Sequence, residues 1–305
     1  MIWLAWRQAR AQILLASGLL AVVLLILITT HGHIARTPEA DLTTAYQSLR
    51  LLGTALIGVP ALIGAFWGAP LLARELELGT HRLAWTQGIT RRRWLATKLG
   101  VLGTAAAITT AAFALTFTWW SAPFDATGNR IGTANFGQRG IAPIAYALFA
   151  VALGTLCGAV IRRTLPAMVA TLTGFVVVRF SFQLVVRPHL LNTVVLTQPL
   201  SLFGPGDSAT RTGTWVLSTK ILDAGGHPLS RSAADELLVR SCNLTRSSAP
   251  EAWSKCASQL GVRDVVRGHP ASQFWTLQLW EAAAFGALTI ALVIACFWWV
   301  RHRTS

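Results

Sequence analysis

Residues 51–98 read LLGTALIGVPALIGAFWGAPLLARELELGTHRLAWTQGITRRRWLATK, an uncharged apolar run followed directly by a basic segment. The hydrocarbon core of a bilayer is about 30 Å thick and needs about 20 apolar residues of helix at 1.5 Å each. The run Leu51–Ala73 is long enough to cross that core. This stretch therefore predicts a membrane-spanning helix followed by a short loop that remains on one side of the membrane.

The composition of the whole chain agrees with this prediction. Of its 305 residues, 53% are hydrophobic and only 12% are charged, which is too little polar surface to cover a soluble globule of this size. Five further runs qualify as spans, namely Ile13–Thr30, Leu99–Trp120, Ile141–Ile161, Leu165–Val186 and Phe274–Val300. We therefore expect an all-α polytopic membrane protein with six transmembrane helices, its lipid bilayer being the plasma membrane of the cell.

The positions of lysine and arginine predict which side each loop faces, because short cytoplasmic loops carry an excess of these residues. They gather in alternate short segments, at Arg7 and Arg10, along residues 74–98, at Arg162 and Arg163, and at Arg301 and Arg303. Both termini and the loop 74–98 are therefore predicted to be cytoplasmic. The same placement explains the formal net charge of +14 without nucleic acid as a partner.

One long polar segment, residues 187–273, lies between the fifth and sixth predicted helices. It would form a small extracellular domain of mixed structure, between a transmembrane part at 1–186 and a last helix with its tail at 274–305. Cys242 and Cys256 both lie in this segment, and a disulfide would form there in an oxidising compartment. Spacing alone does not establish that bond.

Few residues inside the predicted spans carry chemistry. Arg179 and Glu281 are predicted to lie at similar depth, which indicates an intramembrane ion pair, because an unpaired charge there is costly. The alternative is that Arg179 extends outward to the interface. His31 and His33 lack a third ligand, so we expect no metal site and no bound cofactor.

Two pairs of small residues with helical spacing allow helices to approach closely in lipid. These are Gly64 with Gly68, and Gly154 with Gly158. We interpret both as packing within one subunit. A seam between two subunits is the alternative.

Membrane orientation requires only a few basic residues in the loop 74–98. The loop also contains acidic residues, tryptophans and glycines among its arginines. Such a segment can form short amphipathic helices with one face for a partner. Gly79 and Gly88 would permit breaks, and Thr90 is a predicted N-cap for the turn that holds three arginines. The alternative is an ordinary basic loop. At the N-terminus, MIWLAWRQARAQ predicts an interfacial helix.

This loop, the WLAWRQ stretch at residues 3–8 and the six-helix layout resemble ABC type-2 exporter permeases. In that family the loop after the second helix is a coupling helix that seats in a cleft of a separate ATPase subunit. The resemblance implies that ATPase coupling involves Glu75, Glu77, Gly79, Thr80, Arg82, Arg91, Arg92, Arg93, Trp94 and Lys98. It also implies a second permease copy or homologue as a partner.

ATP hydrolysis is not expected on this chain, because it has no G-x-x-x-x-G-K-[ST] sequence to hold phosphates. ATP and Mg would be bound by the partner ATPase, and the chain would be a transporter subunit rather than an enzyme. The substrate would be hydrophobic or amphipathic. The alternative is a membrane-embedded sensor or assembly protein, with an extracellular ligand-binding domain and a cytoplasmic partner-docking loop.

Overall fold

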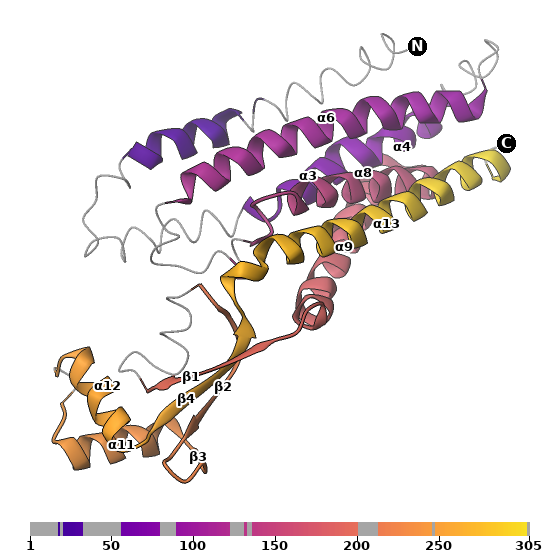
Figure 1. Cartoon of the computed structure of the whole chain (residues 1–305). Helices are drawn as coiled ribbons and strands as arrows, with labels where there is room; N and C mark the ends of the chain where they lie inside the picture. The colour runs from indigo at the N-terminus through magenta and orange to yellow at the C-terminus, as the bar shows by residue number, and fades with distance from the viewer. Residues whose placement is uncertain are drawn as a thin grey trace. The chain divides into compact units, whose positions relative to one another are not determined.

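A computed structural model of the chain describes residues 18, 21–32, 56–79, 90–122, 131–132, 136–200, 213–245 and 248–303. The chain divides into two compact units, which are described separately (Figure 1). The helical unit comprises residues 1–122, 136–187 and 276–305, and the sheet unit comprises residues 123–135 and 188–275.

The long helices of the helical unit run side by side (Figure 1). Its main elements are α3 (Val59–Ile63), the π-helix η1 (Gly64–Gly68), α4 (Ala69–Glu77), α6 (Arg91–Trp120), α8 (Ala142–Ile161), α9 (Thr164–Ser181), the π-helix η3 (Phe182–Val186) and α13 (Phe274–His302). The short 3-10 helix η4 (Arg187–His189) follows η3. Thus α3, η1 and α4 form one continuous helical path, and a π-helix interrupts the regular geometry in two places.

Four segments of the described chain are long and apolar enough to cross a membrane. They are Arg91–Trp120, Ala142–Ile161, Thr164–His189 and Ala271–His302. A shorter apolar helix occupies Ala21–Gly32, and the rest of the first predicted span lies outside the described residues. The chain is therefore mostly helical with four candidate spans, while six spans and the N-terminal interfacial helix stay predictions.

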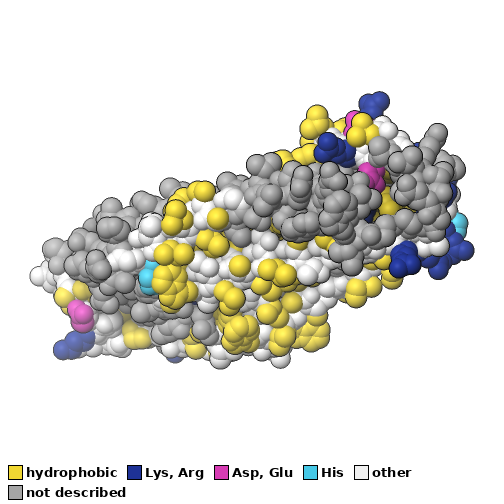
Figure 2. Space-filling model, turned by 90° about the horizontal axis from the view of Figure 1, so that it is seen from above, with side chains coloured by type: hydrophobic (Ala, Val, Ile, Leu, Met, Phe, Trp, Pro, Cys, Tyr) yellow, Lys and Arg dark blue, Asp and Glu magenta, His cyan; other side chains and the backbone are white. Residues whose placement is uncertain are grey.

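The exposed surface of these helices is rich in large apolar side chains. Leu115, Leu165 and Leu184 are each more than two-thirds exposed. In the face shown by Figure 2, hydrophobic side chains cover much of the described surface, and several Lys and Arg side chains gather toward the right-hand end of the view. This distribution is typical of helices that face lipid and end in a basic interface.

The boundaries of the helices follow local rules. Thr90 has extended backbone angles (φ −67°, ψ 139°), and its hydroxyl accepts a hydrogen bond from the amide of Arg93, which confirms the predicted N-cap. The helix α6 therefore begins at Arg91, well before the predicted start of the span at Leu99. Gly79 has φ +69° just after α4, as expected for a break, whereas Gly88 lies outside the described residues.

The four glycines of the two small-residue pairs meet at a single crossing of η1 and α4 with α8. A Cβ on Gly64 would lie 2.6 Å from the Cβ of Ala150, and one on Gly154 would lie 2.5 Å from the carbonyl oxygen of Gly64. Gly158 is packed in the same way against the backbone of Ala69. Packing within one subunit is thereby confirmed for both pairs.

We expect Gly154→Ala to destabilise the helical unit by about 1–3 kcal/mol, because the added methyl group meets backbone atoms that cannot rotate away. Thermal unfolding of the purified protein in detergent measures the effect. Gly286→Ala on α13 is the matched control, since a Cβ there has no neighbour within 4 Å. Equal stability of the two variants would contradict the tight crossing.

The sheet unit contains a four-stranded antiparallel sheet in the order β1-β4-β2-β3. Its elements are β1 (Val194–Pro199), β2 (Trp215–Leu222), β3 (Pro228–Leu229), α11 (Arg231–Cys242), α12 (Pro250–Gln259), β4 (Arg263–His269) and the 3-10 helix η5 (Ala271–Gln273). In the central strand β4, Val266 pairs with Leu196 of β1 and with Thr219 of β2. This combination of strands and helices agrees with the mixed structure predicted for the segment 187–273.

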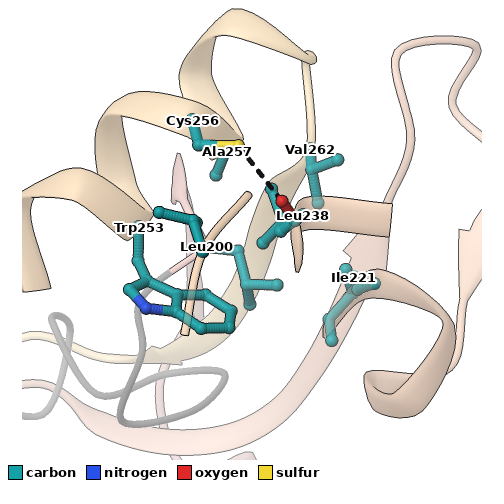
Figure 3. Packing of buried hydrophobic residues seen from close by; sticks show 9 residues of the cluster. Leu200, Ile221, Leu238, Trp253, Cys256, Ala257 and Val262 are labelled. Carbon is teal, nitrogen blue, oxygen red and sulfur yellow. Dashed lines mark hydrogen bonds between the residues drawn. The ribbon is translucent and has the colours of Figure 1, made fainter. Parts of the chain in front are cut away.

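The core of the sheet unit lies where α11 and α12 pack against the sheet. Leu238, Trp253 and Val262 are buried there together with Leu200 and Ile221 (Figure 3). A unit of this size has a small hydrophobic core, so a covalent cross-link is expected to add to the stability of its fold.

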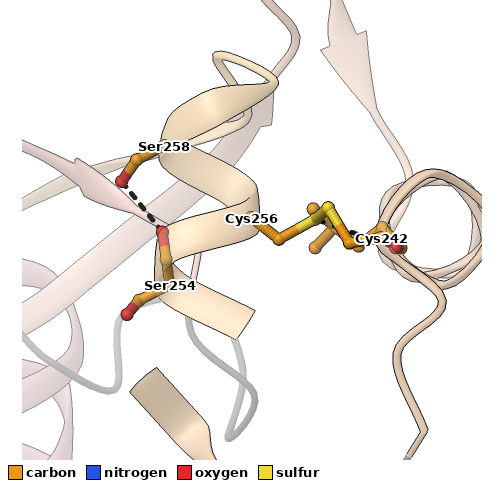
Figure 4. Close-up of a disulfide and its surroundings, with 5 residues drawn as sticks. Cys242, Ser254, Cys256 and Ser258 are labelled. Carbon is orange, nitrogen blue, oxygen red and sulfur yellow. Dashed lines mark hydrogen bonds between the residues drawn. A yellow bond between two sulfur atoms is a disulfide. The ribbon is translucent and has the colours of Figure 1, made fainter. Parts of the chain in front are cut away.

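A disulfide joins the two helices of the sheet unit. Cys242 at the end of α11 is bonded to Cys256 in α12, with an S–S distance of 2.04 Å and a Cα–Cα distance of 6.3 Å (Figure 4). Cys256 is also part of the buried core. The sequence alone did not establish this bond, and the structure shows the two sulfur atoms bonded.

Candidate functional site

The predicted coupling loop is described at its two ends. Its first end is the last turn of α4, which carries Glu75 and Glu77, and its second end is the first turns of α6. Residues 80–89, with the predicted coupling residues Thr80 and Arg82, lie outside the described residues. Within the described residues, the site therefore consists of the contacts that hold the two ends of the loop.

An ion pair joins these two ends. The carboxylate of Glu75 on α4 contacts the ammonium group of Lys98 on α6, and the two side chains are only 15% and 8% exposed. The same ammonium group lies 4.7 Å from the centre of the Trp94 ring, an arrangement that favours the charged lysine. Because the pair is largely shielded from water, it is expected to hold α4 and α6 together more firmly than a surface pair.

The second acid connects α4 to a different helix. One carboxylate oxygen of Glu77 accepts hydrogen bonds from the hydroxyl and the amide of Thr164, at 2.7 Å and 3.0 Å. Thr164 is the first residue of α9, so the carboxylate caps an N-terminus that carries partial positive charge. The hydrogen bonds from Thr164 lower the pKa of Glu77, which keeps the carboxylate ionised at neutral pH.

A third contact at this basic end involves α8 and α13. The guanidinium of Arg162, directly after α8, donates a 2.6 Å hydrogen bond to the carbonyl oxygen of Arg303, directly after α13. Arg162 has φ 57°, the left-handed conformation that commonly ends a helix.

These contacts separate the described coupling residues into three groups. Glu75, Lys98 and Trp94 lie together at the base of the loop, and Glu77 lies with Thr164, which the sequence had not singled out. Arg92 and Arg93, in contrast, are exposed in the first turn of α6. We define the Glu75–Lys98 and Glu77–Thr164 contacts as the loop brace, since together they connect α4 to α6 and α9.

Toward the other end of the helices, a buried cluster of charges surrounds Glu281 of α13. Arg179 of α9 lies 3.3 Å from this carboxylate, so the structure brings together the two residues predicted as an intramembrane pair. Arg187 donates from Nε and Nη2 to the two carboxylate oxygens, at 2.8 Å and 2.9 Å. The hydroxyl of Tyr146 on α8 donates a further hydrogen bond of 2.5 Å. One carboxylate thus joins residues from α8, α9 and α13.

One aromatic ring lies against each arginine of the cluster. The guanidinium of Arg179 lies 4.2 Å from the centre of the Tyr146 ring, and that of Arg187 lies 4.3 Å from the centre of the Phe136 ring. Glu281 and Arg187 are fully buried. With two guanidiniums and one carboxylate, the cluster has a net charge of +1 away from water, and the ring faces offset part of the desolvation cost.

The burial of Arg187 is a finding that the sequence interpretation did not address. Arg187 was assigned as the first residue of the polar segment 187–273, whereas it is fully buried and belongs to the helical unit. Its spacing of eight residues from Arg179 was an available signal, because residues that far apart on a helix share a face.

Another polar contact links the short helix Ala21–Gly32 to the end of α6. The ring of His31 stacks on that of Trp119, with centroids 3.8 Å apart, and the Trp120 indole donates a 2.9 Å hydrogen bond to the hydroxyl of Thr30. His31 is thus part of helix packing, and His33 lies outside the described residues.

The helices and their charged ends define a polytopic membrane protein, with helices that are connected at both ends by buried or shielded polar contacts. The sequence model of a family described as ABC-2 membrane transporter related matches residues 2–187, and the chain belongs to that family. No curated protein and no solved structure matches the chain. The matched range ends at Arg187 of the charge cluster and does not include residues 188–275 of the sheet unit.

Proposed function

We propose that this chain is the permease subunit of an ATP-binding-cassette exporter, which moves a hydrophobic or amphipathic substrate out of the cell. Membership in the ABC-2 family supports a permease-like role, because membrane subunits of this kind generally act with an ATPase. ATP and Mg would be bound by that separate chain. A second copy of this chain, or a homologue, would complete the transporter in the plasma membrane.

The observation that carries the proposal is the loop brace. A loop that only followed the inside-positive rule would need arginines, but it would not need its two ends joined by a shielded ion pair. Closure of the ATPase would push on the loop, and the Glu75–Lys98 pair would make α4 and α6 move together. The Glu77–Thr164 contact would pass the same displacement to α9.

Alternating access follows in this proposal from two arrangements of the helices, between which ATP shifts the population. The charge cluster around Glu281 would hold α8, α9 and α13 together at their ends far from the loop, while the ends near the loop move. Substrate would enter and leave along the apolar helix surfaces. Both termini and the loop would be cytoplasmic, and the sheet unit with its disulfide would be extracellular.

The test is reconstitution with a candidate ATPase encoded beside this chain. The permease and the tagged ATPase are co-expressed, purified together and placed in lipid nanodiscs. We expect the two chains to copurify, and the ATP turnover of the complex to exceed that of the ATPase alone. A permease that neither copurifies with the ATPase nor changes its turnover would instead support the sensor or assembly function.

A further inference from the structure

A cleft of about 250 Å³ lies between the beginning of α6 and the end of α13. Both helices belong to the helical unit, and both are among the segments long enough to cross a membrane. Its lining residues are Thr90, Arg91, Arg92 and Leu95 on one side, and Phe297, Val300 and Arg301 on the other. The cleft therefore lies at the ends of two candidate spans, where the bilayer interface is expected.

The rim of the cleft is strongly basic. Three arginines line it, and none of the described lining residues is acidic. Arg92 and Arg301 are both exposed, so their guanidiniums can reach a ligand that enters from the interface. The N-terminus of α6 adds partial positive charge at the same place. These features favour an anion, and guanidinium groups match the geometry of phosphate oxygens well.

The wall beneath the arginines is apolar. Leu95 and Val300 are buried in the hydrophobic cluster that closes the floor of the cleft, and Phe297, which is partly exposed, packs against the same cluster and presents apolar surface to the cleft. A free phosphate ion gains nothing from such a wall. A molecule with an anionic head and hydrocarbon chains satisfies both parts of the cleft, because burial of each CH₂ group is favourable.

We propose that this cleft binds the headgroup of an anionic phospholipid, with its phosphate between Arg92 and Arg301 and the upper part of its acyl chains against Phe297. The cytoplasmic leaflet supplies anionic lipids, and basic residues at helix ends attract them. A lipid held here would contact α6 directly beside the loop brace and would bridge α6 to α13.

The experiment uses the full-length permease without any ATPase, so its outcome is independent of the proposed transport function. Short-chain dioctanoyl phosphatidylglycerol, dioctanoyl phosphatidylcholine and inorganic phosphate are titrated separately into the detergent-purified protein, and bound ligand is counted by native mass spectrometry. We expect phosphatidylglycerol to bind more tightly than the other two. In the variant Arg92→Gln/Arg301→Gln, its dissociation constant should rise about 30-fold.

The matched control is Arg263→Gln/Arg267→Gln, which removes the same charge from two exposed positions on β4. This control should bind phosphatidylglycerol as the unmodified chain does, and its size-exclusion profile also reports whether the protein is folded. Equal loss of binding in both variants would show attraction by net charge alone and would overturn the site. Equal binding of phosphatidylcholine, or of inorganic phosphate, would overturn the assignment to an anionic lipid.

Discussion

Replacing Glu281 with alanine is expected to lower the free energy of unfolding by about 3–5 kcal/mol, because two buried guanidiniums lose the carboxylate that both of them contact. The hydroxyl of Tyr146 would lose its hydrogen-bond acceptor at the same time. The change in the free energy of unfolding is measured by titrating the purified protein with denaturant in mixed micelles.

The matched control removes a carboxylate that also pairs with an arginine, but at an exposed position. Glu236 on α11 contacts Arg240 one turn later, and these side chains are 59% and 77% exposed. Glu236→Ala should therefore cost only about 0.3–0.5 kcal/mol. If Glu281→Ala cost as little, the buried cluster would contribute nothing to stability.

A charge swap within the pair is expected to recover only part of the stability, because the cluster is a triad rather than a simple pair. In Arg179→Glu/Glu281→Arg, the new arginine at position 281 would meet Arg187, whose Nε lies 2.8 Å from the present carboxylate. The double variant again has two guanidiniums and one carboxylate, so it should be more stable than Glu281→Arg, which sets three buried guanidiniums together, and less stable than the unmodified chain. Replacing Arg179, Arg187 and Glu281 together with methionine removes every uncompensated charge and should recover part of the stability lost in Glu281→Ala.

The elements of the helical unit that the sequence predicted best depend on local information. The end of α8 at Ile161 and the start of α13 at Phe274 coincide with the predicted bounds, because apolar runs there end at charged or polar residues. Thr90 was recognisable as an N-cap from its position before three arginines. The glycine pairs were recognisable from their spacing, although the identity of their partner helix was not.

The contacts that form the candidate site depend on residues far apart in the chain. Glu77 and Thr164 meet only because α4 packs beside α9, and no local pattern relates them. Arg187 was assigned to the polar segment because it is the charged residue that directly follows the apolar run ending at Val186. Its burial depends on Glu281, which lies on a helix far away in the sequence. The strand order β1-β4-β2-β3 is likewise set by pairings between distant segments.

The second large effect is expected at the loop brace. Glu75→Lys should leave the permease folded and bound to its ATPase, but should reduce ATP turnover to the basal rate of the ATPase alone. The substitution sets two ammonium groups against each other in a place where the present side chains are only 8% and 15% exposed. Their repulsion would separate α4 from α6, so that movement of the loop no longer reaches the helices. Turnover is measured in nanodiscs that contain both chains.

Glu77 allows a graded version of the same test. Glu77→Gln keeps an oxygen that can accept the hydrogen bonds of Thr164 but loses the charge at the N-terminus of α9, so a partial reduction in turnover is expected. Glu77→Lys places a cation at that N-terminus and should abolish stimulated turnover. Glu251→Lys, an exposed change of the same charge on α12, should leave turnover unaffected.

The swap Glu75→Lys/Lys98→Glu separates a brace from a direct contact with the ATPase. If Glu75 and Lys98 act on each other, the swap restores an ion pair between α4 and α6, and a substantial part of stimulated turnover should return. If Glu75 instead contacts the ATPase, the swap should not rescue turnover, and Glu75→Lys should weaken copurification as well. Retained binding with lost turnover in the single variant, followed by rescue in the double variant, is the result that the geometry of the brace predicts.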